Sequence, residues 1–373
     1  MRNTLKAATL ESKFPLLAVE ADCIISKDAD ITAVFEVDLP ELFTVTAAEY
    51  EAVHAAWAKA IKVLPNYTVV HKQDWFIRED YRSQTDKENL SFLSRSYEMH
   101  FNERPFLNHK CYLYLTKTTK ERMRMQSSFS SLCRGFIIPK EVDKDTTAHF
   151  LDTVGQFARI VNDTGLVHLR RLVGDEITGT ENKAGLVEKY FCLSMENTTA
   201  LEDIELGDDG LRVGDKHVSV HTLSELDALP GKVGTDCRYE RLSTDKSDCK
   251  LSFASPVGLL LSCNHLYNQY IFLDDSGENL QRFEKNARNM QSLSKYSRSN
   301  QINKEWIDLY LNDAHSFGLT SVRAHCNIIA WTDNPMEVKN MRNDVGSQIA
   351  MMECKPRHNT VHAVLGGDAG ERR

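Results

Sequence analysis

The chain has 373 residues, of which 42% are hydrophobic and 26% are charged, a balance typical of globular proteins and long enough for two or three domains. Its longest apolar runs, at 14–19, 257–261 and 328–331, are far shorter than the roughly 18 residues of a membrane-spanning helix. The net charge of −8 argues against a general nucleic-acid coat.

The first residues carry charges but lack the uninterrupted apolar stretch of a secretory signal, so we expect a cytoplasmic protein. The nine cysteines are scattered singly, and an odd number cannot form a complete disulfide framework. Cys111, Cys192 and Cys326 stand in apolar runs, where we expect them to be buried as small hydrophobic side chains.

The first 40 residues contain three short extended segments, at 16–19, 23–26 and 31–38. Asp28 and Asp30, which favour turns, separate the last two. This pattern predicts a small antiparallel meander.

Residues 46–49 have the spacing of a capping box, with Thr46 three residues before Glu49. Apolar residues follow at steps of three and four, at Tyr50, Val53, Trp57, Ile61 and Leu64. Pro65 then ends the pattern, which predicts an amphipathic helix.

The next part of the chain alternates between strand and helix patterns. Strands are predicted at 67–74, 111–116 and 166–172, and helices at 89–101 and from about residue 150 to Gly165. Residues 198–234 are rich in turn formers and acids, so we interpret them as a peripheral or linking segment.

From residue 256 the periodic patterns become stronger. Strands are predicted at 257–263, 270–273 and 321–331, and helices at 280–290, 303–316 and 335–352. The strand at 321–331 alternates between apolar and polar residues, which is typical of a half-buried strand. Together these elements predict an α+β fold, in which the meander is followed by split α/β layers of sheet and helix.

Motifs of nucleotide chemistry are absent from the sequence. The Gly231-Lys232 pair lacks the upstream glycine and the following hydroxyl of a P-loop, and we interpret it as a turn. Dinucleotide glycine spacing, a Gly-x-Ser-x-Gly elbow and a His-Glu-x-x-His helix are also missing. We therefore expect no catalytic residues and no cofactor in this chain.

Two segments have some features of metal sites. The residues Cys237, Cys249, Cys263 and His265 lack the close pairs typical of structural zinc sites. Residues 274–278 resemble the start of a calcium loop but lack its remaining ligands. We expect no metal at either place and interpret 274–278 as a turn and a helix N-cap.

The segment 282–304 contains six basic residues and one acid, Glu284, which gives it a net charge of +5. The basic residues are Arg282, Lys285, Arg288, Lys295, Arg298 and Lys304, and many hydrogen-bonding side chains lie between them. Such a face suits an acidic partner, phosphate groups or a neighbouring subunit. A solvated helix face is the alternative interpretation. A weaker cluster, Lys117, Lys120, Arg122 and Arg124, leaves the same two alternatives open.

Four long blocks of sequence, at 1–15, 229–261, 287–306 and 344–360, closely resemble the N-terminal half of the TraG family of conjugative-transposon ATPases. These are Bacteroides-type relatives of the large motor ATPase of type IV secretion systems. The resemblance extends from Met1 to about Thr360. It implies a cytoplasmic ATPase, peripheral to the inner membrane, that acts as a hexamer and binds ATP and magnesium through a C-terminal RecA-like domain.

No residue of that motor domain is present in this sequence. Together, the sequence patterns and the resemblance predict a docking domain at 1–197, a linking segment at 198–255 that is turn-rich and acidic in composition, and an α/β segment at 256–360 that would lead into the absent motor. The glycine-rich tail at 361–373 departs from the family, and we expect it to reflect a truncated or frame-shifted reading of a longer gene.

The resulting hypothesis is a docking and oligomerisation part of a conjugative-transfer ATPase, without NTP hydrolysis by this chain. Its expected partners are the inner-membrane proteins of the conjugation channel and further copies of itself. One alternative is an NTPase component whose activity is completed in trans. The other is a DNA-binding module that uses the patch at 282–304, although the acidity of the chain argues against direct nucleic-acid binding.

Overall fold

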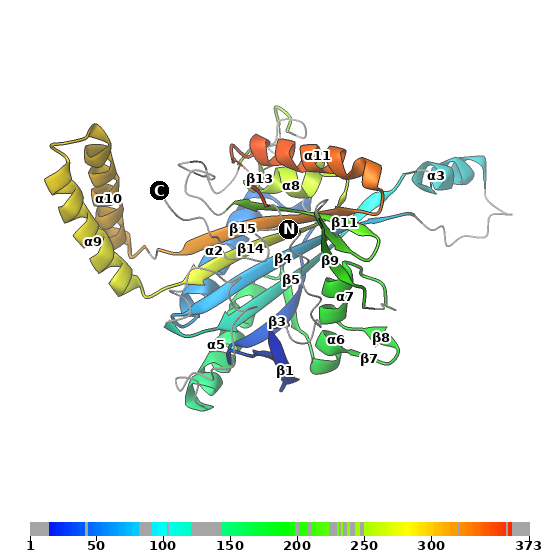
Figure 1. Ribbon diagram of the computed structural model, residues 1–373, viewed down its shortest axis with the longest axis horizontal. Coiled ribbons are helices and arrows are strands. Elements are labelled where there is room, and N and C mark those ends of the chain that lie inside the picture. Colours follow the sequence, from blue (N-terminus) through cyan, green and yellow to red (C-terminus); the bar gives the residue numbers. More distant parts are fainter. Residues whose placement is uncertain are drawn as a thin grey trace, which may run out of the picture.

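The structure is a computed structural model. It describes residues 15–41, 44–81, 91–102, 104–120, 144–197, 201–207, 210–223, 230, 233, 237–238, 243–246, 250–319, 321–355 and 357–359. Its framework is a 12-stranded sheet in which every pair of strands is antiparallel. Helices pack on both faces of this sheet, and two helical segments project from opposite ends of it (Figure 1). The predicted α+β class is confirmed.

The predicted N-terminal meander is confirmed. It consists of β1 (Leu16–Glu20), β2 (Cys23–Ser26) and β3 (Ile31–Asp38), paired in this order. The turn between β1 and β2 places Ala21 and Asp22 at φ values of 50° and 58°. Two successive residues with positive φ give a connection whose twist matches that of the flanking strands, which explains the tight turn.

The helix predicted after the meander is α2 (Ala47–Val63), and its capping box is present. It packs beside α5 (Lys144–Asn162) on one face of the sheet, where the Trp57 and Phe157 rings meet edge to face at 5.7 Å. Both helices cover a cluster of buried side chains that includes Phe35 and Leu113. The apolar face of each helix is therefore what fixes it on the sheet.

Replacing Thr46 with Ala should lower the free energy of unfolding by about 1 kcal/mol, because its hydroxyl accepts a hydrogen bond from the Glu49 amide at 3.3 Å. Urea denaturation would measure the change. Thr44→Ala is the matched control, since the Thr44 hydroxyl lies before the helix and donates only to the Glu41 carbonyl in the contacts described. Equal effects of the two substitutions would contradict a specific capping role.

Two long central strands follow, β4 (Thr68–Glu79) and β5 (Phe106–Lys117), and both extend beyond the predicted limits. They pair along their whole length, from Thr68 opposite Lys117 to Glu79 opposite Phe106. The predicted helix between them is α3 (Phe92–Asn102), which projects away from the sheet. This part of the chain is thus a β-hairpin with a helical insertion at its end.

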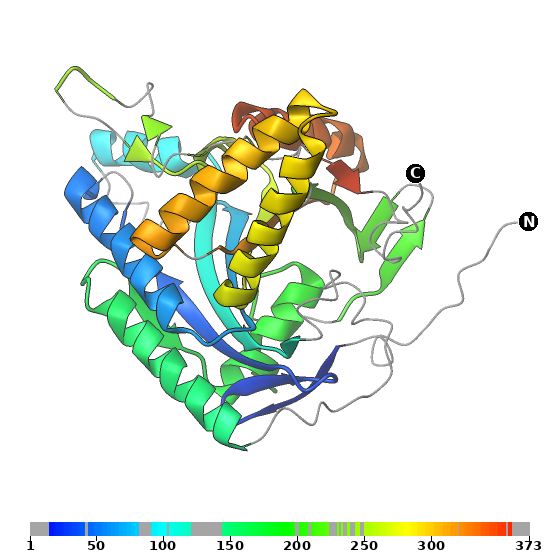
Figure 2. The same ribbon diagram turned by 90° about the vertical axis from the view of Figure 1, so that its left-hand side faces the viewer.

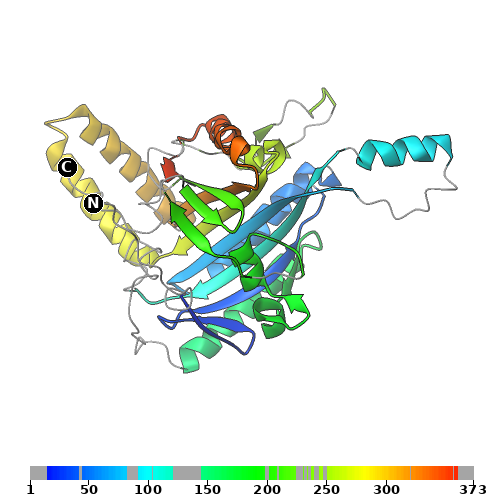
Figure 3. The ribbon, with the colours of Figure 1, turned by 45° about the vertical axis from the view of Figure 1, so that its right-hand side comes forward.

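The strand predicted at 166–172 is β6 (His168–Arg171), which pairs with β3. It leads into α6 (Gly174–Thr178), the small strand pair β7 (Gly179–Thr180) and β8 (Lys183–Ala184), and α7 (Leu186–Cys192). The helices α6 and α7 lie on the face of the sheet opposite to α5 (Figure 3).

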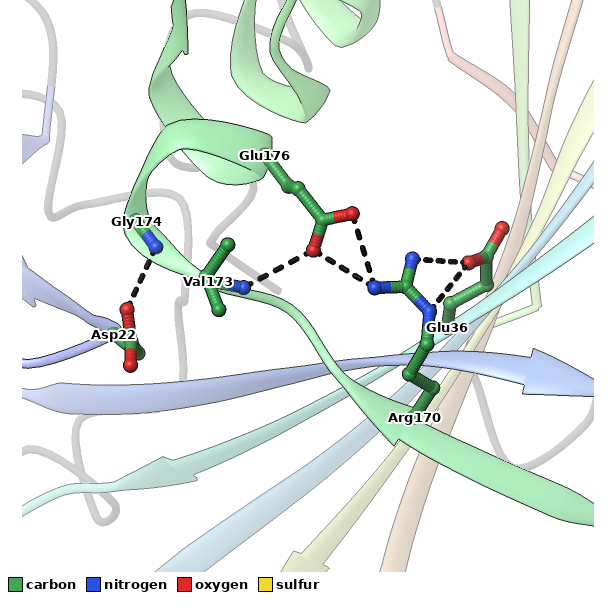
Figure 4. Close-up of polar contacts among 6 residues, drawn as sticks. All are labelled: Asp22, Glu36, Arg170, Val173, Gly174 and Glu176. Atoms are coloured by element: carbon green, nitrogen blue, oxygen red, sulfur yellow. Dashed lines mark hydrogen bonds and ion pairs between the residues drawn. The ribbon is translucent and has the colours of Figure 1, made fainter.

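An ion-pair cluster fixes the chain where it leaves β6 (Figure 4). The Arg170 guanidinium donates to Glu176 at 2.9 Å and to Glu36 at 3.2 Å. Next to it, the Gly174 amide donates to the Asp22 carboxylate at 2.7 Å. Because Arg170 is half exposed, we assign this cluster a positioning role and little net stabilisation.

The segment interpreted as a link, 198–255, contains three strands of the main sheet: β9 (Ile204–Gly207), β10 (Gly210–Val213) and β11 (Lys216–Leu223). That interpretation needs correction, because part of the segment belongs to the sheet. Among its turn formers, Gly207 ends β9, Gly210 begins β10 and Gly214 lies between β10 and β11. In β11 the buried Ser219 and His221 side chains hydrogen-bond to each other at 3.1 Å, so a polar sequence forms an internal strand.

The strand predicted at 257–263 is wrong, because residues Ser255–Leu260 form helix α8. Pro256 lies in the first turn of α8, where its missing amide hydrogen costs nothing. A short apolar run does not distinguish a strand from a buried helix. Here Val257 and Leu261 are buried against α11 (Val338–Met351). A separate pair of short strands, β12 (Cys237–Arg238) and β13 (Lys250–Leu251), precedes α8.

The last part of the chain adds β14 (Asn264–Leu273) and β15 (Arg323–Thr332), which pair with each other. Between them lie α9 (Ser276–Leu293) and α10 (Arg298–Phe317), as predicted. The turn η5 (Pro335–Glu337) then leads into the predicted helix α11, and β16 (Arg357–Asn359) pairs with β11. Asn327 and Trp331 on one side of β15 and Ile328 and Ala330 on the other are buried, so this half of the strand is covered on both faces.

The sheet runs continuously through the predicted regions 1–197 and 256–360, because β4 pairs with β14 over nine residue pairs, from His265 opposite Phe76 to Leu273 opposite Thr68. Strand β11, from the region between them, pairs with β15. The tail predicted to differ from the family, 361–373, lies outside the described residues. In the described part, the predicted boundaries therefore do not coincide with breaks in the sheet.

Candidate functional site

The predicted basic patch lies on a helical hairpin formed by α9 and α10 (Figure 2). This hairpin replaces the short turn that would otherwise connect β14 with β15. Its base is held by Asp274, whose carboxylate accepts two hydrogen bonds from the Arg323 guanidinium at 2.7 and 3.1 Å. The predicted N-cap at 274–278 is also confirmed, because the Asp275 side chain accepts from the Glu278 amide at 3.0 Å. The hairpin is thus firmly attached where it leaves the sheet.

The two helices pack against each other through a narrow apolar seam. Ala287 of α9 and Ala314 of α10 are buried in it, and the rings of Phe283 and Tyr310 meet at 5.0 Å. Small residues allow the two helices to approach closely, and the two aromatic rings fill the remaining space. The opposite side of each helix is left facing solvent.

The six basic residues of the patch are all on this hairpin, but they do not share one surface. Arg282, Lys285 and Arg288 recur at steps of three on the exposed side of α9. Lys295 lies in the turn between the helices, and Arg298 begins α10. The sixth, Lys304, is partly buried and forms an ion pair with Asp308 at 3.5 Å. Three cations along one exposed helix face can bind an anionic partner through charge-assisted hydrogen bonds.

A second feature of the hairpin was not predicted from the sequence. Ile302, Trp306 and Leu309 lie on the exposed side of α10. Trp306 is 62% exposed and Leu309 is 61% exposed. We call these three residues the hairpin stripe. Trp306 and Leu309 lie within the helix predicted at 303–316, and Ile302 lies just before it. The spacing of four and three residues was the signal in the sequence that could have indicated this stripe. The projecting hairpin thus presents a basic surface on α9 and an apolar surface on α10.

The other projecting helix, α3, has no buried residue. Leu93 and Tyr97 are 78% and 61% exposed, and Phe101, four residues further on, contacts the Tyr97 ring at 4.6 Å. We call Leu93, Tyr97 and Phe101 the arm stripe. An exposed apolar stripe on a projecting helix is typical of a protein-protein contact surface.

A polar cluster lies on the face of the sheet that α5 and α11 cover, between the apolar cluster under α5 and the one under α11. The buried Asp74 side chain pairs with Lys72 and with His109, whose Nε2 lies 3.0 Å from the carboxylate. Burial raises the pKa of Asp74, but the charge of Lys72 and the hydrogen bonds from His109 and Lys72 outweigh it and hold the pKa at about 2. Burial also raises the pKa of the neighbouring Cys111 thiol, so this group is not an activated nucleophile.

The opposite face of the sheet carries a hydrogen-bonded row of amide side chains. The buried Asn268 accepts from His71 at 2.9 Å and from Gln73 at 3.0 Å, and it donates to Asn327 at 2.8 Å. The ring of His71 is stacked on Tyr270 at 4.1 Å, and burial lowers the pKa of His71 to about 4. Since these amides and rings bind one another, we assign the row a structural role.

The weaker basic cluster is only partly within the described residues, because Arg122 and Arg124 lie outside them. Lys117 and Lys120 line a small pocket together with Tyr67. The Lys117 ammonium group lies 5.4 Å from the centre of the Tyr67 ring, and Lys120 forms an ion pair with Glu278 at the base of the hairpin. These contacts connect the pocket to the hairpin.

Within the described ranges, no group of three His, Cys, Asp or Glu side chains could hold a metal ion. The same part of the chain contains no helix long and apolar enough to cross a bilayer.

One family described as "Domain of unknown function, B. Theta Gene description (DUF3875)" matches residues 3–55. In the described part of the chain this match covers the β1–β3 meander and the first half of α2. No curated protein matches the chain. The matching family carries no functional assignment and does not extend to the hairpin, so the resemblance to the TraG family stays a prediction.

Proposed function

We propose that this chain is a docking and oligomerisation part of a conjugative-transfer (type IV secretion) ATPase, and that it does not itself hydrolyse nucleotide. Its partners would be inner-membrane proteins of the conjugation channel, which it meets from the cytoplasmic side. The observation that carries the proposal is the α9–α10 hairpin, which projects from the sheet and exposes both a basic and an apolar surface.

Two further features support a docking role. The base of the hairpin is fixed by the Asp274–Arg323 pair, so a partner bound to the helices is held in a defined orientation to the sheet. The sequence also lacks the P-loop glycines and lysine that a nucleotide-hydrolysing site requires. Together with the chain-wide resemblance to TraG proteins, these features favour binding and positioning over catalysis.

Reversing the charge at Arg288 and Arg298 together should weaken the binding of inner-membrane conjugation proteins about tenfold, because the net charge of the segment 282–304 falls from +5 to +1. Pull-down yields from detergent-solubilised membranes would measure this. Lys59→Glu with Lys62→Glu is the matched control, since both lysines are exposed on α2 and the change in net charge is the same. If both double variants bind equally well, the patch is not the docking surface.

The α9 surface also makes DNA binding the second candidate. Arg282, Lys285 and Arg288 lie in a row on one exposed helix face, which is an arrangement that can contact successive phosphates. This candidate predicts a salt-sensitive retardation of DNA that Arg288→Glu with Arg298→Glu abolishes. Retardation of DNA together with unchanged pull-down yields would favour DNA binding over docking.

A further inference from the structure

The charges of the α9–α10 hairpin are separated along its length. Its outer half, residues 285–304, contains five bases and no acid, and so has a net charge of +5. The inner parts of the two helices, residues 276–284 and 305–317, contain one base and five acids, which gives a net charge of −4 with His315 neutral. The turn between the helices is at the end of the hairpin that lies away from the sheet (Figure 1). The hairpin therefore carries its positive charge outward.

The turn at this outer end exposes two large side chains, one aromatic and one aliphatic. It consists of residues 294–297, between the end of α9 and the start of α10. The Ser297 side chain caps α10, and the Asn300 side chain donates to the Leu293 carbonyl at 3.2 Å. Although these contacts fix the turn, Tyr296 remains 84% exposed and Leu293 remains 44% exposed.

Three cations lie beside these two side chains. Lys295 is in the turn, Arg298 begins α10, and Arg288 lies before the turn by about 9 Å along α9. All three are exposed, and none of them forms an ion pair in the part of the chain that the structure describes. We call these cations, Leu293 and Tyr296 the hairpin tip. Exposed aromatic and aliphatic side chains beside cations are typical of surfaces that bind the membrane interface.

The hairpin places these cations beyond the reach of the acidic remainder of the chain. Exposed charges are screened from each other beyond the Debye length, about 8 Å at physiological ionic strength. Glu284 and Glu305, the acids nearest to the turn along the two helices, are about 12–15 Å from it at 1.5 Å per residue. Helix α10 has 20 residues and is about 30 Å long. The hairpin tip can therefore meet an anionic surface as a separate positive cluster, although the whole chain has a net charge of −8.

We propose that the hairpin tip binds directly to an anionic lipid surface. Leu293 and Tyr296 enter the headgroup region, where an aromatic ring with a polar hydroxyl is stabilised. The three cations contact lipid phosphates. The exposed leucine favours lipid over nucleic acid, since the phosphates of a nucleic-acid strand offer it no apolar surface. This inference rests on the proposed function only for the place of action at the inner membrane, and it adds lipid as a partner of the same hairpin.

Vesicles that contain no protein test this contact directly. The full chain should sediment with vesicles of phosphatidylglycerol and phosphatidylcholine in equal parts, and much less with phosphatidylcholine alone, because only the first surface is anionic. Lys295→Gln with Arg298→Gln should weaken binding about 30-fold, since each cation near such a surface contributes about fivefold. Lys59→Gln with Lys62→Gln is the matched control, because these exposed lysines of α2 lie outside the hairpin and the loss of charge is the same.

Tyr296→Ser separates the apolar contribution from the charged one. It should weaken binding by the same factor at low and high salt, because burial of a ring is not screened, whereas the effect of the charge variant should diminish as salt is added. Circular dichroism would verify that each variant keeps its helices. Equal sedimentation with both kinds of vesicle, no sedimentation with either, or full binding by the charge variant would each overturn the proposal.

The competing partners give different results. Retardation of DNA by a chain that binds no vesicles would assign the hairpin tip to nucleic acid instead. Vesicle binding without capture of conjugation proteins would contradict only the docking function. Capture of those proteins by a chain that does not bind vesicles would contradict only the contact with lipid.

Discussion

Replacing Asp74 with Asn should lower the free energy of unfolding by about 3 kcal/mol, since the variant leaves the Lys72 ammonium group without its counter-ion. The Asp74 side chain is only 5% exposed, and that of Lys72 is 27% exposed. A charge that loses its partner in such a place cannot recover full hydration. Urea denaturation at neutral pH would measure the change.

The matched control is Asp308→Asn, which breaks the surface ion pair with Lys304. Both side chains of that pair are partly exposed, so the loss should be below about 1 kcal/mol. A similar small loss for Asp74→Asn would show that the Lys72–Asp74–His109 cluster does not stabilise the sheet.

The same carboxylate predicts a dependence of stability on pH. Its pKa is about 2 in the folded protein and 3.8 in an unperturbed side chain, so the folded state favours the charged form. The resulting stabilisation, about 2 kcal/mol, is fully present above pH 4 and is lost as the pH falls toward 2. His71 has a separate effect, because burial lowers its pKa to about 4 in the folded protein from 6.5 in an unperturbed side chain. As the pH falls from 6.5 to 4, the unfolded chain binds a proton at His71 that the folded protein does not, so stability decreases over this range as well. The difference between the wild-type protein and Asp74→Asn isolates the contribution of Asp74.

Replacing Trp75 with Ala should lower the free energy of unfolding by about 4 kcal/mol, because the substitution leaves a cavity at a fully buried position. The Trp75 ring of β4 meets the ring of Trp331 of β15 edge to face at 6.4 Å, across β14. The indole also donates a hydrogen bond to Gln73 at 2.9 Å. One residue thus links strands from the two regions predicted as separate.

Unfolding of Trp75→Ala should therefore remain a single transition with a lower midpoint, visible at the same urea concentration by far-ultraviolet circular dichroism and by tryptophan fluorescence. Trp306→Ala provides the comparison, since this exposed tryptophan of the hairpin stripe should change stability by less than about 0.5 kcal/mol. Two separate transitions in the Trp75 variant would indicate that the two regions unfold independently.

The elements that could be predicted are those whose local signals agree. Helix α2 has both a capping box and an apolar period, and the predicted start at Thr46 is confirmed. The meander and the helix pair α9–α10 were recognised for the same reason. In each case the residues that determine the element lie within it.

The missed elements are determined by contacts with distant residues. The apolar run after Pro256 is a helix because it packs on α11, and nothing in the run itself excludes a strand. Strand β11 contains His217, Ser219, His221 and Thr222, and it lies within the sheet because β15 pairs with it. Spacing along the chain does not show such partners.

The candidate site was only partly predictable. All six basic residues are on the α9–α10 hairpin as the sequence indicated, yet helix geometry places Arg282, Lys285 and Arg288 apart from Lys304. The exposure of Trp306 depends on which side of α10 packs on α9, and this depends on the seam at Ala287 and Ala314. A helical period identifies an apolar stripe but does not show whether another element covers it.

The measurement that tests the docking proposal most directly is co-purification with a chain that lacks the hairpin. Residues 276–319 would be replaced by a short Asn-Gly turn, because β14 and β15 are already paired up to Phe272 opposite Arg323. We expect this chain to keep the sheet and its cooperative unfolding but to lose the inner-membrane conjugation proteins that the wild-type chain captures. Capture of the same proteins in equal yield by the hairpin-less chain would contradict the proposal.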